Sequence, residues 1–185
     1  MKENPLMKRL GIARIALKKD LICFFIPWVA AMLLEFILCG VDGTGLSDFW
    51  RNLWALISDP RNVVSFPVRR TMGTLLFVIG LTTMIVGQLT LQRNYSGLVL
   101  IRKDHRLITH GVYRFIRNPI YLGAIIVFTS LPIYADSRYG MLAMFLMLPL
   151  FLMRIKLEEE LLTQYFGREY EVYYEQTKRL IPFLF

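Results

Sequence analysis

The sequence predicts an all-α protein, a multi-pass integral membrane bundle of about four spans with a C-terminal helical hairpin and a cytoplasmic amphipathic tail. Hydrophobic residues make up 55% of the 185 residues and charged residues only 19%, whereas soluble domains have roughly 45–50% and about 25%. The apolar residues lie in long blocks, and the basic residues that give a net charge of +8 flank these blocks. Membrane lipids are therefore the expected anionic partner, and nucleic acid is not expected.

The N-terminal part, residues 1–70, is predicted to contain a basic cytoplasmic lead-in and a first span over residues 21–39. This apolar run approaches the length of about 20 residues that crosses a bilayer. It lacks a clear small-x-small cleavage site before Asp42, so we interpret it as a retained span rather than a signal peptide. Residues 46–57 are predicted to form an interfacial helix, because Trp50 and Trp54 suit the aromatic belt of a membrane.

The second part, residues 71–185, begins with the clearest span, residues 72–91, which carries no charge. Gly73, Gly80 and Gly87 recur at a seven-residue spacing and therefore lie on nearly one helix face. That face either allows a neighbouring helix to approach closely or consists of glycines that a membrane helix merely tolerates.

A basic segment over residues 93–118 follows, with Asp104 as its single acidic residue. The positive-inside rule places it in the cytoplasm. Asn118 and Pro119 are a good N-cap and first residue for a helix. Residues 120–134 and 140–153 then form a helical hairpin joined by residues 135–138, which places the amphipathic tail and both chain termini on the cytoplasmic side.

Three consecutive carboxylates, Glu158, Glu159 and Glu160, follow the last span. Acidic residues at a helix C-terminus oppose the macrodipole. They either form a solvated helix end or have a cationic partner, which would be a ligand ammonium group or one of the basic residues of segment 93–118. Arg154 lies one turn earlier; it either forms an ion pair with Glu158 or holds a carboxylate or phosphate of a ligand.

Several chemistries are not expected from this sequence. His105 and His110 stand without a Cys or carboxylate cluster, so we expect no metal site. Cys23 and Cys39 lie in one apolar segment, where a helix would separate them by about 24 Å, too far for a disulfide. The sequence has neither a Gly-x-Ser-x-Gly elbow nor a phosphate-binding Walker loop.

Two motifs on either side of the hairpin carry a family resemblance. The first is Leu-Ile-Thr-His-Gly-Val-Tyr-Arg-Phe-Ile-Arg-Asn-Pro-Ile-Tyr-Leu-Gly; the second combines Glu-Glu-x-Leu-Leu with Phe-Gly-x-Glu-Tyr-x-x-Tyr. Together, and in this order, they resemble the isoprenylcysteine carboxyl methyltransferase family, and phospholipid methyltransferases share a related pattern. The resemblance covers about residues 93–185.

The resemblance implies that S-adenosyl-L-methionine binds on the cytosolic side of a small multi-span protein. The residues that it assigns to the cofactor are His105, Arg106, Leu107, Ile108, Tyr113, Asn118, Pro119, Ile120, Tyr121 and Glu158, the last for its cationic amino end. It assigns the substrate to Arg154, as the catalytic, orienting residue. Asn118 departs from the family, whose eukaryotic members usually have histidine there; asparagine cannot titrate near pH 7.

The resulting function hypothesis is O-methylation of a carboxylate on a lipid-like, isoprenylcysteine-type substrate that enters from the membrane. A carboxylate has a reference pKa near 3.5 and needs no general base. The first alternative is N-methylation of a phospholipid amine or another amphiphile, which must first lose a proton. The second is a non-catalytic membrane protein that binds anionic lipid or a partner through its basic segment.

Overall fold

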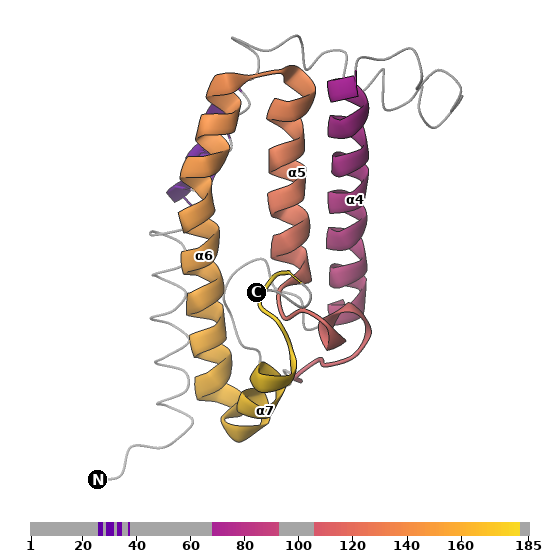
Figure 1. Ribbon diagram of the computed structural model, residues 1–185. Helices are drawn as coiled ribbons and strands as arrows, with labels where there is room; N and C mark the ends of the chain where they lie inside the picture. The colour runs from indigo at the N-terminus through magenta and orange to yellow at the C-terminus, as the bar shows by residue number, and fades with distance from the viewer. Residues whose placement is uncertain are drawn as a thin grey trace. The chain divides into compact units, whose positions relative to one another are not determined.

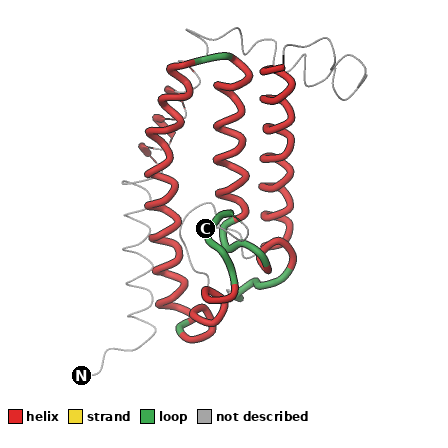
Figure 2. Tube along the Cα trace, viewed as in Figure 1, coloured by secondary structure: helices red, strands yellow, loops and turns green. Residues whose placement is uncertain are grey.

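The computed structural model describes residues 68–92 and 106–181, together with scattered helical positions between Ile26 and Ile37. The main helices in these ranges are α4 (Val68–Leu91), α5 (Pro119–Ala135), α6 (Arg138–Phe166) and α7 (Arg168–Gln176). A short 3-10 helix, η4 (Gly111–Arg114), precedes α5. Figures 1 and 2 show that helices dominate the described chain and are joined by short loops. The all-α prediction is therefore confirmed for the described residues.

These residues fall into two compact units, each assembled from segments that are distant in sequence. The described part of unit 1 consists of residues 85–92, 106–121 and 150–181, and that of unit 2 consists of residues 68–84 and 122–149. Unit 1 contains most of the first sequence motif and all of the second, whereas unit 2 consists mainly of apolar helix. The site discussed below lies within unit 1.

In unit 2, α5 and α6 form the expected hairpin, with Asp136 and Ser137 as the link. Asp136 adopts a left-handed backbone conformation with φ of 56°, which turns the chain after Ala135. The Ser137 hydroxyl oxygen accepts a hydrogen bond from the Gly140 N–H at 2.8 Å, so Ser137 caps the start of α6. Asp136 also forms an ion pair with Arg69 at the start of α4.

The glycine face of α4 is a packing seam. A Cβ atom on Gly80 would lie 2.8 Å from the Gly123 carbonyl oxygen, and one on Gly73 would lie 2.7 Å from the Tyr134 Cβ, both within unit 2. Within unit 1, a Cβ on Gly87 would lie 2.8 Å from the Ile120 side chain. Because all three glycines meet α5, the first interpretation of the seven-residue spacing is confirmed.

In unit 1, α6 continues the hairpin helix through Arg154 to Phe166 and ends at Gly167, whose φ is 57°. The Gly167 N–H donates to the Thr163 carbonyl at 2.9 Å, as in a glycine-terminated helix. After α7, the chain returns to the segment before α5, where Ile116 and Lys178 form an isolated parallel bridge. The Arg117 N–H donates to the Lys178 carbonyl at 2.8 Å.

Of the helices that the structure describes, α4 and α6 are long and apolar enough to cross a membrane, and α5 is a shorter apolar helix. Leu89 of α4 is 67% exposed and Leu146 of α6 is 68% exposed, as expected for side chains that face lipid. The second span begins at Val68, four residues before the predicted 72–91, so Arg69 and Arg70 belong to the helix. In the predicted first span, the described positions are helical; the remainder of that span and the interfacial helix at 46–57 lie outside the described residues.

Candidate functional site

Two adjacent carboxylates of α6, Glu158 and Glu159, form the centre of two different groups of side chains in unit 1. Consecutive residues of an α-helix point about 100° apart, at 3.6 residues per turn. The two side chains therefore contact different neighbours although their backbones are adjacent.

Glu159 is a buried carboxylate, 5% exposed, that joins three segments of the chain. Its Oε1 accepts hydrogen bonds from Arg117 Nε at 3.1 Å and from Asn118 Nδ2 at 3.2 Å. Its Oε2 accepts from Arg179 Nε at 3.0 Å and lies 2.8 Å from an Arg179 terminal nitrogen. We call Glu159, Arg117, Asn118 and Arg179 the Glu159 cluster. One of the basic residues of segment 93–118, Arg117, is thus a cationic partner of the acidic triplet.

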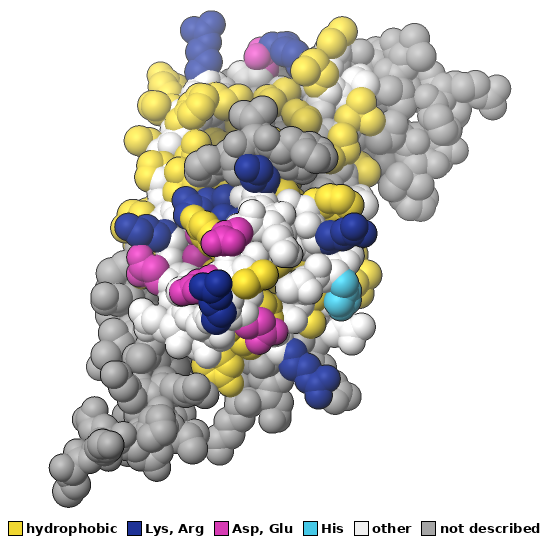
Figure 3. Space-filling view, turned by 60° about the horizontal axis from the view of Figure 1, so that its bottom comes forward, with side chains coloured by type: hydrophobic (Ala, Val, Ile, Leu, Met, Phe, Trp, Pro, Cys, Tyr) yellow, Lys and Arg dark blue, Asp and Glu magenta, His cyan; other side chains and the backbone are white. Residues whose placement is uncertain are grey.

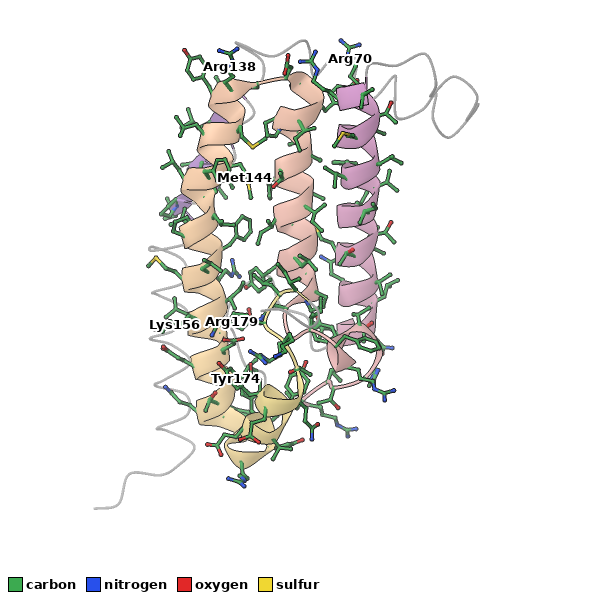
Figure 4. The ribbon with its side chains drawn as sticks, viewed as in Figure 1. Arg70, Arg138, Met144, Lys156, Tyr174 and Arg179 are labelled. Atoms are coloured by element: carbon green, nitrogen blue, oxygen red, sulfur yellow. The ribbon has the colours of Figure 1, made fainter. Side chains whose placement is uncertain are left out.

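Arg117 also holds the end of the chain. Its guanidinium donates to the carbonyl oxygens of Tyr174, at 2.8 Å, and of Thr177. It lies 3.9 Å from the centroid of the Tyr174 ring, a cation–π contact. Figure 4 shows Tyr174 of α7 and Arg179 of the following segment near the end of α6 at which Lys156 is labelled. The cluster therefore fastens the segment before α5 and the C-terminal segment to one helix.

The charge on Arg179 is favoured by this arrangement. Partial burial opposes the charge, but hydrogen bonds and the negative charge of Glu159 outweigh it, so the pKa of Arg179 is raised. Asn118, predicted to contact the cofactor, donates its amide N–H groups to Glu159 and to the Arg179 carbonyl. Its side chain thus takes part in joining the two segments.

Glu158 belongs to a second group, formed with Tyr121 and Arg154. The Tyr121 hydroxyl donates to Glu158 Oε2 at 2.6 Å, and the Arg154 guanidinium carbon lies 5.9 Å from the centroid of the Tyr121 ring. Arg154 is buried, whereas Glu158 and Tyr121 are partly exposed. We call these three residues the Glu158 group. The structure brings together two predicted cofactor residues and the predicted substrate residue, which come from α5 and α6.

The other predicted site residues differ in exposure. Arg106 is exposed, Leu107 and Ile108 are partly exposed, and Tyr113 is buried. His105 lies outside the described residues.

Pro119 and Ile120 lie at the start of α5. A Cβ atom on Gly87 would lie 3.5 Å from Pro119 Cγ and 2.8 Å from Ile120 Cγ1. These two residues therefore pack α5 against α4, whatever further contact they make with a ligand.

Two tyrosines of α7, Tyr170 and Tyr173, lie in the second sequence motif but were given no role in the site. Tyr173 is buried and its hydroxyl donates to the Tyr113 carbonyl at 2.8 Å. Tyr170 is 1% exposed; among the residues that the structure describes, its hydroxyl oxygen has no hydrogen-bond partner. Burial raises the pKa of both phenols, and the charge of Glu159 raises that of Tyr170 further. Both therefore remain protonated at neutral pH. The sequence feature that could have identified these two residues is the Tyr-x-x-Tyr spacing in the second motif.

Charged side chains of both signs gather on the face that Figure 3 brings toward the viewer. They include the exposed pairs Lys156–Glu160 and Arg168–Glu171. Exposed pairs of this kind contribute little to stability. The buried Glu159 cluster and the Glu158 group are therefore the parts of this polar region that require a specific explanation.

Comparison with known structures first defines the class of fold. The chain superposes with a TM-score of 0.62 on a solved structure described as the eukaryotic intramembrane Ras methyltransferase ICMT (isoprenylcysteine carboxyl methyltransferase). The match covers 81% of this chain and 53% of that one, at 24% sequence identity. At this identity the likeness establishes the helical fold alone.

A family model then gives the assignment. The model described as PEMT, phospholipid methyltransferase, matches residues 68–169, which is more than half of the chain. The protein belongs to this phospholipid methyltransferase family, as the sequence motifs indicated. The matched range includes α4, α5 and α6, and with them the Glu158 group.

Curated relatives carry a more specific name. A probable protein-S-isoprenylcysteine O-methyltransferase of Oryza sativa subsp. indica is 34% identical over 116 residues, which cover 61% of this chain and 61% of the relative. Protein-S-isoprenylcysteine O-methyltransferase B of Arabidopsis thaliana is 31% identical over 115 residues, covering 57% of this chain and 58% of the relative. The Saccharomyces cerevisiae enzyme of the same name is 31% identical over 117 residues, covering 61% and 48%. The chain thus spans about half to three-fifths of the length of these relatives.

Proposed function

We propose that this protein is an integral membrane methyltransferase that uses S-adenosyl-L-methionine to methylate a carboxylate on a lipid-like, isoprenylcysteine-type substrate. The observation that carries the proposal is the Glu158 group. It places an anion, a hydroxyl and a guanidinium together at the polar end of an apolar helix. The names of the rice, Arabidopsis and yeast relatives support the choice of acceptor.

The residues of unit 1 fit the proposed cofactor. Its amino-acid end carries an ammonium group, for which the partly exposed Glu158 carboxylate is a suitable acceptor. The buried hydroxyl of Tyr170, which has no partner among the described residues, is a further unused polar group in the same unit. When bound, the cofactor supplies a methyl group on a positively charged sulfur. The protein's task is to bind it beside the acceptor and exclude water.

Arg154 suits the acceptor in this proposal. Its planar guanidinium can hold a carboxylate through two parallel hydrogen bonds, and its burial beside the Tyr121 ring restricts its orientation. A substrate carboxylate held by Arg154 would already be ionised at neutral pH, ready to accept the methyl group that the bound cofactor would supply. No proton is transferred, so no general base is needed. Alignment of this kind can lower a barrier by several kcal/mol.

The apolar surfaces of α4 and α6 support a location in the membrane, and they suit lateral entry of a lipophilic substrate. The positive-inside rule, applied to segment 93–118, supports a cytoplasmic position for the polar end of unit 1 and for both chain termini. Methyl transfer would then take place at the cytoplasmic membrane boundary.

A second acceptor is supported by the description of the family model, which names phospholipid methyltransferases. A phospholipid amine would have to lose a proton before it attacked the methyl group. Within the Glu158 group, the Glu158 carboxylate is the member that could accept this proton, because a guanidinium offers only hydrogen-bond donors. Methylation of a carboxylate forms an ester, whereas methylation of an amine forms a carbon–nitrogen bond. The product therefore distinguishes the two functions.

The test uses purified protein in detergent with S-adenosyl-L-methionine labelled in the methyl group. S-farnesylcysteine with a blocked amino group and a free carboxylate is one acceptor, and phosphatidylethanolamine is the other. We expect label in the farnesylcysteine product, released as volatile methanol after base treatment, since only an ester is cleaved in this way. Base-stable label in the phospholipid would instead identify N-methylation. Failure of the protein to bind S-adenosylhomocysteine would overturn both enzymatic functions.

A further inference from the structure

Two neighbouring cross-links join the start of α5 to the acidic part of α6. Tyr121, in the first turn of α5, donates its hydroxyl to Glu158 at 2.6 Å. Arg117, which lies just before α5, pairs with Glu159 at 3.1 Å, and the side chains of this pair are only 6% and 7% exposed. The buried pair therefore fixes the entry of α5 against the turn of α6 that carries Glu158.

The segment that leads into α5, residues 113–118, depends on the C-terminal segment, residues 173–179, for its conformation. It begins in η4 and then continues without a further helix. The Phe115 carbonyl accepts a hydrogen bond from the Lys178 N–H at 3.2 Å, and the Arg117 N–H donates to the Lys178 carbonyl at 2.8 Å. The C-terminal segment thus holds the backbone that precedes α5.

The Arg117 guanidinium connects these parts of unit 1 at one buried point. Besides pairing with Glu159, it donates to the carbonyl oxygens of Tyr174, at 2.8 Å, and of Thr177. A guanidinium presents five donors in a fixed plane, so it can bind a carboxylate and two carbonyl groups together. The compact ammonium group of lysine, on its flexible stem, does not reproduce this geometry.

Asn118, the next residue, is oriented by the same cluster. Its amide nitrogen donates to Glu159 at 3.2 Å and to the Arg179 carbonyl at 3.1 Å. These bonds engage both N–H groups of the amide and thereby fix the direction of its oxygen. Asn118 and Tyr121 are both among the residues that the family motifs assign to the cofactor. A displacement of Arg117 would therefore move two groups that are expected to contact the ligand.

We propose that Arg117 is a positioning residue, which acts through the C-terminal segment to hold Asn118 and Tyr121 in the arrangement that binds the ligand at Glu158. This inference rests on the proposed function. It adds to the site a segment beyond the family-model match, which ends at residue 169. Support of this kind is important, because a displacement of about 1 Å by a change far from the chemistry can weaken function about 100-fold.

The test measures S-adenosylhomocysteine binding by calorimetry on the purified full chain in detergent, at a temperature well below the Tm. Calorimetry reports the Kd separately from the number of molecules that are able to bind. Arg117→Lys retains the charge that pairs with Glu159 but removes the planar set of donors. We expect about a tenfold rise in Kd with an unchanged number of binding sites.

Two controls separate positioning from stability. Arg114→Lys makes the same substitution in the same segment at an exposed residue, and it should leave the Kd within about twofold of the wild type. Gly80→Ala introduces a Cβ atom into the packing seam of unit 2, 2.8 Å from the Gly123 carbonyl oxygen. This second control should lower the Tm without changing the Kd of the folded protein.

The inference is overturned if Arg117→Lys resembles Gly80→Ala, with a lower Tm and an unchanged Kd, because Arg117 would then be only structural. If Arg117→Lys does not fold, Arg179→Ala takes its place, since it loosens the C-terminal segment at a more exposed residue. A Kd raised about threefold would then support the inference, and an unchanged Kd would overturn it. If the wild type does not bind S-adenosylhomocysteine, the proposed function fails as well; wild-type binding with unchanged variants overturns this inference alone.

Discussion

Glu158 and Glu159 are adjacent in sequence, yet they differ in burial, in partners and in the role that their surroundings favour. Glu159 is 5% exposed and accepts from two arginines and an asparagine. Glu158 is partly exposed and accepts from the Tyr121 hydroxyl. Glu159 is thus bound to two other segments of the chain, whereas Glu158 is bonded to Tyr121, beside Arg154. The difference teaches that adjacent carboxylates on one helix can have different partners.

The comparison also explains how acidic residues are accommodated near the end of α6. The structure does not place the acidic triplet at a helix C-terminus, because α6 continues to Phe166, so the macrodipole penalty expected from the sequence is small. The cost at Glu159 comes instead from burial, because a buried carboxylate loses its hydration. Arg117 and Arg179 offset this cost at Glu159, and they do so by bringing two other segments to the helix. The Glu159 cluster therefore links electrostatic compensation to the folding of the segment before α5 and of the C-terminal segment.

The largest expected effect is that of Glu159→Gln on stability. Removal of one charge from a buried pair leaves the opposite charges uncompensated and costs about 3–5 kcal/mol. A glutamine can retain part of the hydrogen bonding, so we expect about 3 kcal/mol, measured by urea unfolding in detergent. Glu160→Gln is the matched control, because Glu160 is exposed and its contact with Lys156 is 4.0 Å long; it should change stability by less than about 0.5 kcal/mol. Equal effects of the two variants would contradict the distinction.

The next effect concerns the Glu158 group and is measured as turnover. Arg154→Lys keeps the positive charge but removes the planar fork that can hold a carboxylate through two bonds. We expect turnover with the farnesylcysteine acceptor to fall by about 10- to 100-fold, or about 1.4–2.7 kcal/mol of lost barrier reduction. S-adenosylhomocysteine affinity should remain within about twofold of the wild type. A loss of cofactor affinity without a loss of turnover would reverse the proposed division between Arg154 and Glu158.

The smallest effect is expected at the edge of the Glu159 cluster. The Arg179 side chain is 29% exposed, against 6% for Arg117, so water partly screens its interaction with Glu159. Arg179→Ala should therefore destabilise the protein by about 1 kcal/mol, less than Glu159→Gln. Chemical unfolding of the two single variants and the double variant measures the coupling. Fully additive effects would show that Arg179 and Glu159 do not interact energetically.

Much of the fold could be predicted because it depends on regular patterns. The apolar blocks predicted the long helices. The glycine spacing was compatible with close helix packing or with merely tolerated glycines, and the structure shows that α5 approaches this face closely. The polar residues between the hairpin helices predicted a link that the structure places at Asp136 and Ser137. The start of α4 was set too late, because the charged Arg69 and Arg70 lie beyond the apolar run although they continue the helix.

The site was predictable only in part. Arg154, Glu158 and Tyr121 were assigned through the family motifs, and the structure brings them together. The pairing of Glu159 with Arg117 and Arg179 was not predicted, because it depends on how the chain returns after α7 and not on spacing along one helix. Tyr170 belongs to the second motif, but its unpartnered hydroxyl was not predicted, because that property depends on packing.

The central claim, that Glu158 serves the ligand while Glu159 serves the fold, is tested most directly by calorimetry with S-adenosylhomocysteine on wild type and Glu158→Gln. The substitution preserves size but removes the charge that would attract the ligand's ammonium group. We predict at least about a tenfold loss of affinity, equivalent to about 1.4 kcal/mol, with an unfolding free energy within about 0.5 kcal/mol of the wild type. Unchanged affinity together with a large loss of stability would contradict the account.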